Sequence, residues 1–172
     1  MYVIALACAE DVDGIVELLQ ANTASRGGSL TGEFPHDKVV KMALNGAPVV
    51  VAHRDGVVVG VLFSAPKDAP APPSVESMLA AWPGGPDAYV YGPACVADTE
   101  RGRGLLGQLY AALRGYRPHQ EAVLFIRRDN TASLRAHERL GMREVAGFAF
   151  DDSDYVVMSN RQDGTANQQG AQ

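Results

Sequence analysis

A glycine-punctuated stretch in the second half of the chain constrains the fold more than any other feature. Arg101-Gly102-Arg103-Gly104-Leu105 follows the apolar run 88–96 and precedes leucines that recur with helical spacing. The pattern predicts a strand, a tight turn and the start of a helix. The first amides of a helix have no partner inside it and carry partial positive charge. Because glycine lets a ligand approach the main chain, the turn is predicted to bind an anion, and a diphosphate is the favoured ligand.

Three interpretations of this turn compete. Gly102, Gly104 and Gly107 match the G-x-G-x-x-G pattern of dinucleotide-binding proteins, with Asp129 as the acidic residue expected about 20 positions later. The second interpretation is a coenzyme A site, and the third is a glycine-rich turn without a ligand. A long segment with a predicted antiparallel hairpin precedes the turn, whereas the dinucleotide pattern belongs to an initial parallel βαβ unit. The dinucleotide interpretation is therefore disfavoured.

Apolar periodicity and turn residues predict an alternation of strands and helices. The expected strands are 2–7, 49–52, 57–63, 88–96, 122–126, 144–150 and 155–158, and the expected helices are 10–22, 37–45, 74–82, 105–116 and 130–140. Asp55-Gly56 predicts a hairpin between the second and third strands. Gly92-Pro93 predicts a bulge or an unpaired stretch in the fourth strand. The proline-rich segment 66–86 is expected to form an ordered cover over a cleft.

Composition limits the class of protein. The chain has 172 residues and 47% hydrophobic residues, which predicts one domain over 1–159 and a disordered polar tail over 160–172. A net charge of -5 argues against nucleic-acid binding, although Arg101 and Arg103 form a local basic site. No apolar run approaches the roughly 20 residues of a membrane span, and the N-terminus lacks a signal-peptide pattern. Cys8 and Cys95 lie far apart and match no metal spacing, so we expect no metal. Free thiols suit a reducing compartment, which predicts a cytoplasmic location, and a disulfide between the two cysteines is the alternative.

A second pattern lies near the C-terminus. Asn130, Ser133 and His137 stand at i, i+3 and i+7, which places them on one stripe of a helix beside an apolar stripe. A helix that borders a ligand cleft has such a polar row. Each residue also has a plain structural explanation, since Asn130 is a good helix N-cap, Ser133 suits a solvated surface and His137 suits a satisfied buried position.

Two blocks together resemble the GCN5-related N-acetyltransferase (GNAT) superfamily. The segment 95–105, Cys-Val-Ala-Asp-Thr-Glu-Arg-Gly-Arg-Gly-Leu, is similar to the fourth strand and Arg/Gln-x-x-Gly-x-Gly/Ala loop of that family. The segment 130–142, which begins at Asn130 and ends in Leu-Gly-Met, is similar to its asparagine-containing helix. The resemblance spans about residues 1–158. It implies an α+β fold with a central mixed, mostly antiparallel seven-stranded sheet, about four flanking helices, and a splay between strands four and five that holds acetyl-CoA.

The resemblance also implies roles for individual residues. Main-chain amides of the loop would bind the pyrophosphate, strand four would pair with the pantetheine arm, and the second block would face the pantetheine or adenine-proximal part of coenzyme A. The implied coenzyme-binding residues are Cys95, Val96, Arg101, Gly102, Arg103, Gly104, Leu105, Leu106, Asn130, Ser133 and His137. Leu106 stands where the family has Gly or Ala, which predicts a shifted start of the following helix.

His137 occupies a position where the family often has a tyrosine that is thought to protonate the leaving thiolate. An unperturbed histidine is mostly neutral at pH 7, so this role requires a carboxylate such as Glu138 or Asp129 to raise its pKa. The alternative is that His137 packs against the coenzyme. For the base that deprotonates the attacking amine, Glu76, Glu33 and a water chain are candidates. Glu33, Trp82, Tyr89 and Tyr91 are candidates for the acceptor pocket, and the aromatic residues also suit a plain core.

These observations favour an acyl-CoA-dependent N-acyltransferase that transfers acetyl from acetyl-CoA, by direct attack, to a small-molecule or peptide amine. A homodimer is the oligomer that the resemblance suggests. The alternatives are a non-catalytic acyl-CoA-binding module and, less favoured, a dinucleotide-binding protein.

Overall fold

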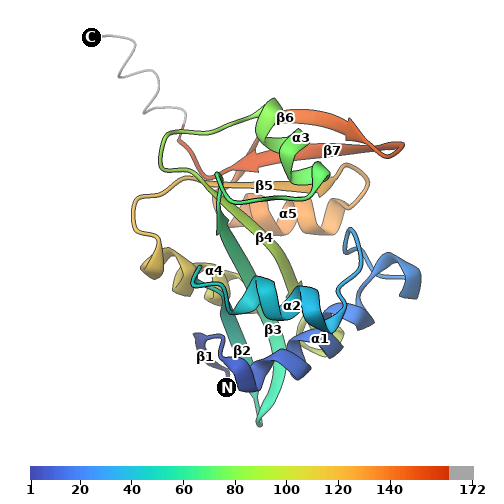
Figure 1. Ribbon diagram of the computed structural model, residues 1–172, viewed down its shortest axis with the longest axis vertical. Helices are drawn as coiled ribbons and strands as arrows, with labels where there is room; N and C mark the ends of the chain where they lie inside the picture. The colour runs from blue at the N-terminus through green and yellow to red at the C-terminus, as the bar shows by residue number, and fades with distance from the viewer. Residues whose placement is uncertain (163–172) are drawn as a thin grey trace. The chain divides into compact units, whose positions relative to one another are not determined.

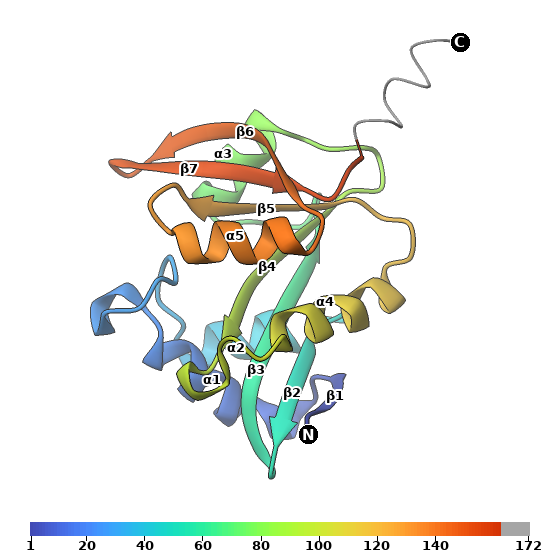
Figure 2. The same ribbon diagram turned by 180° about the vertical axis from the view of Figure 1, so that it is seen from behind.

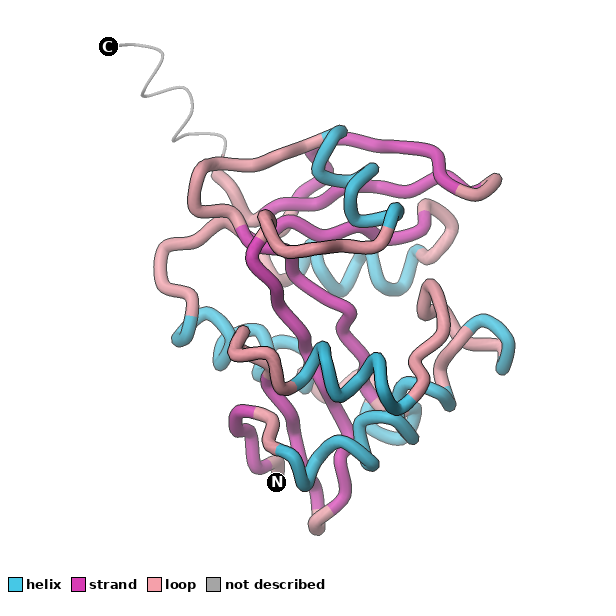
Figure 3. The backbone as a smooth tube through the Cα atoms, in the orientation of Figure 1, coloured by secondary structure: helices cyan, strands magenta, loops and turns pink. Residues whose placement is uncertain are grey.

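The Asp55-Gly56 turn joins strands β2 (Val50–Arg54) and β3 (Val57–Pro66) as a tight antiparallel hairpin, as predicted. Both turn residues have positive φ values, 52° and 79°, which a primed two-residue turn requires. Figure 3 shows the two strands meeting at this turn. The register pairs Val51 with Val61, so both side chains reach the same face of the sheet.

The computed structural model describes residues 1–162. Within them, the remaining strands of a seven-stranded sheet are β1 (Val3–Leu6), β4 (Tyr89–Val96), β5 (Ala122–Arg127), β6 (Arg143–Phe150) and β7 (Ser153–Ser159). The α-helices of the described residues are α1 (Val12–Ala21), α2 (His36–Ala43), α3 (Pro73–Ala81), α4 (Leu105–Tyr116) and α5 (Thr131–Arg139). The sequence thus predicted these elements to within a few residues of their ends. The five helices are the five that periodicity predicted, where the family resemblance implied about four.

The sheet order is β1-β2-β3-β4-β5-β7-β6. β4 and β5 run parallel, whereas β1 with β2, β2 with β3, β5 with β7 and β6 with β7 are antiparallel. This mixed sheet confirms the α+β fold class. The Gly92-Pro93 peptide bond inside β4 is cis.

The chain divides into two compact units. The first comprises Met1–Ala65 and Tyr91–His119, and the second comprises Pro66–Val90 and, within the described residues, 120–162. The single domain expected over 1–159 stays a prediction. Of the tail expected over 160–172, residues 163–172 lie outside the described residues, whereas Asn160 accepts a 3.0 Å hydrogen bond from the Ala122 amide.

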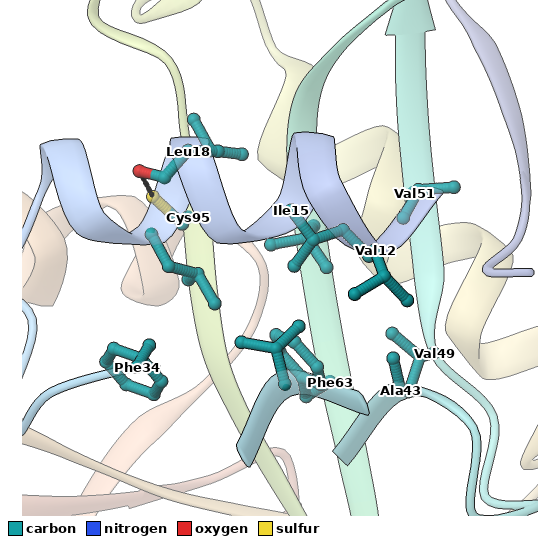
Figure 4. Close-up of a cluster of buried hydrophobic side chains, with 12 residues drawn as sticks. Val12, Ile15, Leu18, Phe34, Ala43, Val49, Val51, Phe63 and Cys95 are labelled. Carbon is teal, nitrogen blue, oxygen red and sulfur yellow. Dashed lines mark hydrogen bonds between the residues drawn. The ribbon is translucent and has the colours of Figure 1, made fainter. Parts of the chain in front are cut away.

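In the first unit, α1 and α2 lie on one face of β2 and β3, and α4 lies on the other (Figures 1 and 2). The apolar face of α1 recurs every three to four residues and is buried, which is why this segment is helical. Figure 4 shows Ile15 and Phe63 in the resulting core. On the opposite face, Gly60 admits α4, because a Cβ there would lie 3.1 Å from Leu105 Cδ2 and from Leu109 Cδ1.

In the second unit, α3 lies in front of β6 and β7 in Figure 1, and α5 lies in front of β5 in Figure 2. The proline-rich segment is ordered, as predicted. Lys67 Nζ donates to the carbonyls of Pro83 and Gly85 at 3.0 and 2.8 Å. These bonds close the segment around α3 and bring its two ends together.

Candidate functional site

The glycine turn has the backbone geometry that an anion cradle needs. Gly102 and Gly104 adopt left-handed φ values of 78° and 77°, which residues with a Cβ rarely adopt. A Cβ built at either glycine meets no atom within 4 Å, so the outer side of the turn is open. Glycine is therefore required here for its conformation, and not to avoid contact with the rest of the protein.

α4 begins immediately after this turn, at Leu105, where the leucine spacing predicts it. The Leu105 side chain is 1% exposed and fixes the first helical turn on the sheet. Gly104 is the N-cap residue and has no side chain to accept hydrogen bonds from the first helix amides. The first main-chain hydrogen bond of the helix runs from the Gln108 amide to the Gly104 carbonyl at 3.3 Å. The shifted helix start expected from Leu106 is wrong, because the helix begins at Leu105 and Leu106 lies in its first turn. The turn thus presents the positive end of α4 beside two open glycines, which suits a phosphate group.

The guanidinium of Arg101 contacts other side chains of the protein. Its Nη2 donates to Asn22 Oδ1 at 2.7 Å and pairs with Asp98 Oδ1 at 3.0 Å. Asn22 is the C-cap of α1 and is 7% exposed. The predicted basic site therefore rests on Arg103, which is exposed, and on the main chain of Arg101.

Cys95 and Val96, at the end of β4, differ in how accessible their side chains are to a ligand. The Cys95 thiol points into the core of the first unit, where Sγ lies 3.9 Å from the Leu18 carbonyl oxygen (Figure 4). Burial raises the pKa of this thiol to about 12. Only the main chain of Cys95 is therefore suited to meet a ligand. Val96 is half-buried, and its predicted contact with the pantetheine arm stays a prediction.

In the second unit, Asn130 is the N-cap of α5, and its Oδ1 accepts a 3.2 Å hydrogen bond from the Ser133 amide. This contact confirms the structural explanation that the sequence allowed for Asn130. Ser133 Oγ lies 3.4 Å from His137 Nδ1, so the predicted polar row does form one stripe of the helix. The contacts of these residues with coenzyme A stay predictions.

The environment of His137 disfavours an acid role. Its Nδ1 lies 2.8 Å from the Ser133 carbonyl oxygen, which only accepts, so Nδ1 carries the proton. The side chain is 4% exposed, and burial lowers its pKa despite the opposing effect of that hydrogen bond. Asp129, one of the carboxylates expected to raise this pKa, pairs with Arg127 at 2.7 Å. His137 is therefore neutral at pH 7 and suits packing better than proton donation.

The acceptor candidates of the first unit are Glu33 and Tyr91. Glu33 is exposed and lines an open cavity of about 390 Å³, whose other lining residues are Gln20, Thr23, Ser25, Arg26, Phe34 and Pro35. Tyr91 is 4% exposed and packs edge-to-face on Tyr110, with ring centroids 5.7 Å apart. Glu33 thus has access to a ligand in that cavity, whereas the plain-core explanation holds for Tyr91.

The candidates of the second unit are Glu76, Trp82 and Tyr89. Glu76 is exposed on α3. Trp82 Nε1 donates to Glu121 Oε2 at 2.9 Å, and Glu121 also accepts from the Gly85 amide at 2.8 Å. Tyr89 is 1% exposed. Trp82 and Tyr89 therefore have evident structural roles, and Glu76 as a base stays a prediction.

Sequence reasoning missed a buried carboxylate beside the glycine turn. Glu100 is 5% exposed and accepts hydrogen bonds from Tyr2 and Arg54, which are distant in sequence. A charged residue next to a glycine turn has no periodicity that would mark it as buried. The only available signal was its place directly before Arg101.

Comparison with known proteins identifies the fold. No protein-family model matches the sequence, and no curated protein matches it. The structure is similar to a GNAT-family acetyltransferase from Streptococcus agalactiae, with a TM-score of 0.72, 16% identity, and coverage of 94% of this chain and 96% of that one. The chain therefore has the fold of the GCN5-related N-acetyltransferases. The resemblance seen in the sequence is thus confirmed at the level of the fold.

Two further solved structures show the same likeness. A GNAT-superfamily phosphinothricin acetyltransferase from Sinorhizobium meliloti, in complex with acetyl-CoA, has a TM-score of 0.67 and 18% identity, over 92% of this chain and 86% of that one. The ribosomal-protein-S18-alanine N-acetyltransferase from Escherichia coli has a TM-score of 0.67 and 14% identity, over 92% of both chains. These neighbours act on chemically different acceptors, so the fold does not specify one.

Residues 1–162 contain no cluster of three or more His, Cys, Asp or Glu side chains arranged to hold a metal ion. Over the same residues we find no helix with the length and apolar character of a transmembrane span.

Proposed function

We propose that the chain is an acetyl-CoA-dependent N-acetyltransferase that acts on an amine. The observation that carries this proposal is the open turn of Gly102 and Gly104 at the start of α4, in a fold that it shares with acetyltransferases. Acetyl-CoA would supply the acetyl group as a thioester. The amides of residues 101–106 would bind its diphosphate, because helix N-terminal amides and accessible glycine backbone recognise phosphate groups.

The residues present fit this ligand. The turn is open, its helix lacks a side-chain cap, and Arg103 adds an exposed positive charge nearby. Glu33, in the open cavity of the first unit, is a candidate to position or deprotonate an amine. The predicted homodimer and cytoplasmic location stay predictions.

A non-catalytic acyl-CoA-binding module is the second candidate. The burial of His137 and its lowered pKa favour this candidate, because a neutral imidazole is poorly suited to supply the acid that the tyrosine of the family is thought to provide. Water, or a group not identified by sequence, would then have to protonate the thiolate in an enzyme.

Two measurements test these proposals. Acetyl-CoA at a hundred times its dissociation constant should stabilise the fold by about 2.7 kcal/mol, whereas NADH should not change the melting temperature. Release of free coenzyme A in the presence of a panel of amines then separates the enzyme from the binding module. Stabilisation by NADH alone would overturn both candidates, and stabilisation by acetyl-CoA without turnover would favour the module.

A further inference from the structure

The carboxylate of Glu100 is buried next to the glycine turn and is fully engaged with the protein. Tyr2 Oη and Arg54 Nη1 both donate to its Oε1 at 2.8 Å, and Thr99 Oγ1 donates to its Oε2 at 3.1 Å. Buried carboxylates are uncommon unless they are paired, because their desolvation is costly. Here the partners form a set that satisfies both oxygens.

These contacts connect the turn to strands that are distant in sequence. Glu100 ends the 3-10 helix Asp98–Glu100 and directly precedes Arg101. Tyr2 stands just before β1, and Arg54 ends β2. A single side chain therefore attaches the start of the turn to the sheet of the first unit.

The anchor is ionised over the whole neutral range. Hydrogen bonds from Tyr2, and then from Arg54, lower the pKa of Glu100 to about 2. The positive charge of Arg54 also balances the carboxylate, so the anchor adds little net negative charge beside a diphosphate site. Gly102 and Gly104, separated only by Arg103, would otherwise leave the turn free to sample many conformations. Ordering them on binding would cost affinity.

We propose that Glu100 is a positioning residue for the coenzyme-binding turn 101–106, which it holds in its binding conformation through Tyr2 and Arg54. This inference rests on the proposed function. Glu100 itself does not contact the coenzyme in this role. Its contribution is to fix the main chain whose amides bind the diphosphate, so its loss should weaken affinity rather than change the chemistry.

The test compares Glu100→Gln with Asp11→Asn in the full chain. Asp11 is a matched control, because it is 8% exposed and accepts a 2.7 Å hydrogen bond from His53, the neighbour of Arg54 on β2. Consecutive strand residues point to opposite faces, so His53 holds Asp11 away from the turn. Calorimetric titration with coenzyme A should give a dissociation constant raised about tenfold by Glu100→Gln, or about 1.4 kcal/mol, and changed less than about twofold by Asp11→Asn.

Two further readouts separate positioning from general loss of structure. Hydrogen exchange at the amides of residues 101–106 should be faster in ligand-free Glu100→Gln than in the wild type and the control. The KM for acetyl-CoA should rise with little change in kcat, while the kinetics with S-acetylpantetheine, which lacks the diphosphate, should not change. Tyr2→Phe removes only one donor and should give an intermediate affinity, which provides a milder variant if Glu100→Gln does not fold.

The outcomes distinguish this inference from the proposed function. A wild-type chain that does not bind coenzyme A overturns the proposed function. Wild-type binding with an unchanged dissociation constant in Glu100→Gln and Tyr2→Phe overturns the positioning role alone. An equal loss of affinity in Glu100→Gln and Asp11→Asn also overturns it, because the effect would then follow stability in general.

Discussion

Arg101 donates a 2.7 Å hydrogen bond from its guanidinium to the buried side-chain oxygen of Asn22. Asn22 in turn donates from Nδ2 to the Leu18 carbonyl at 2.8 Å, and its own carbonyl accepts from the Leu30 amide at 3.1 Å. The glycine turn is thereby attached to the end of α1 and to the segment that follows it. Thr23 and Ser25 of that segment line the open cavity, so this contact attaches the turn to a residue directly before the cavity lining.

We expect Asn22→Ala to lower the free energy of unfolding by about 1–2 kcal/mol, because it removes buried hydrogen bonds. Arg101→Met should cost about 0.5 kcal/mol, since the arginine is largely exposed. The double variant should lose less than the sum of the two, because both changes remove the same contact. Urea denaturation measures this cycle, and Asp98→Asn is the control for the surface ion pair. Strict additivity would show that the contact contributes no free energy.

Gly104→Ala should weaken coenzyme A binding several-fold, because alanine disfavours the left-handed backbone conformation of this residue. Gly46 is a matched control, because its φ is 92° and a Cβ there also meets no atom within 4 Å. Both substitutions should cost about 1 kcal/mol of stability by conformational strain. Only Gly104→Ala should change the dissociation constant measured by calorimetry. The cradle interpretation fails if the two variants bind coenzyme A equally well.

We expect protonation of His137 to lower the free energy of unfolding in mild acid. Burial lowers its pKa from 6.5, so the unfolded chain binds a proton at a higher pH than the folded chain does. The stabilising contribution of the neutral ring is complete above pH 6.5 and declines as the pH falls below that value. The free energy of unfolding, measured by urea denaturation at pH 7.5 and 5.5, should therefore fall less between the two pH values in His137→Gln than in the wild type.

Trp82→Phe should destabilise the second unit by about 1 kcal/mol without altering the choice of acceptor. The indole N–H donates to Glu121, and phenylalanine retains one six-membered aromatic ring but removes this donor. Far-ultraviolet circular dichroism in urea measures the stability, and KM values for two amine substrates report the acceptor preference. A large change in the KM of an amine with unchanged stability would instead support Trp82 as a residue of the acceptor pocket.

The two cysteines should differ sharply in reactivity. Cys8 is exposed, whereas burial raises the pKa of Cys95 to about 12 and leaves almost no thiolate at pH 8. In the folded chain, a disulfide reagent should modify Cys8 quickly and Cys95 only after unfolding. The variant Cys8→Ser should show no fast phase, and rapid modification of that variant would place the Cys95 thiol outside the core.

The elements of this fold were predictable because their signals are local. Asp55-Gly56 has the turn chemistry of a hairpin, and the apolar residues of α1 recur at helical spacing within a single segment. The glycine turn was also readable, because left-handed backbone favours glycine and the leucine pattern of α4 begins directly after it. The N-cap role of Asn130 follows from the same kind of local chemistry.

The roles of several side chains could not be read in this way. His137 was considered as an acid, yet its pKa depends on a burial that neighbours distant in sequence produce. Glu100 was overlooked because its partners, Tyr2 and Arg54, are 98 and 46 residues away. Contacts at such separations leave no periodic trace in a single sequence.

The sequence by itself determined the order of strands and helices, the hairpin, and a glycine turn that opens a helix, since each depends on backbone preferences of adjacent residues. The tertiary structure alone decided that Arg101 binds Asn22, that the Cys95 thiol is buried, and that Glu100 anchors the turn. These properties depend on desolvation and on hydrogen bonds between remote segments, which exist only after the chain has packed.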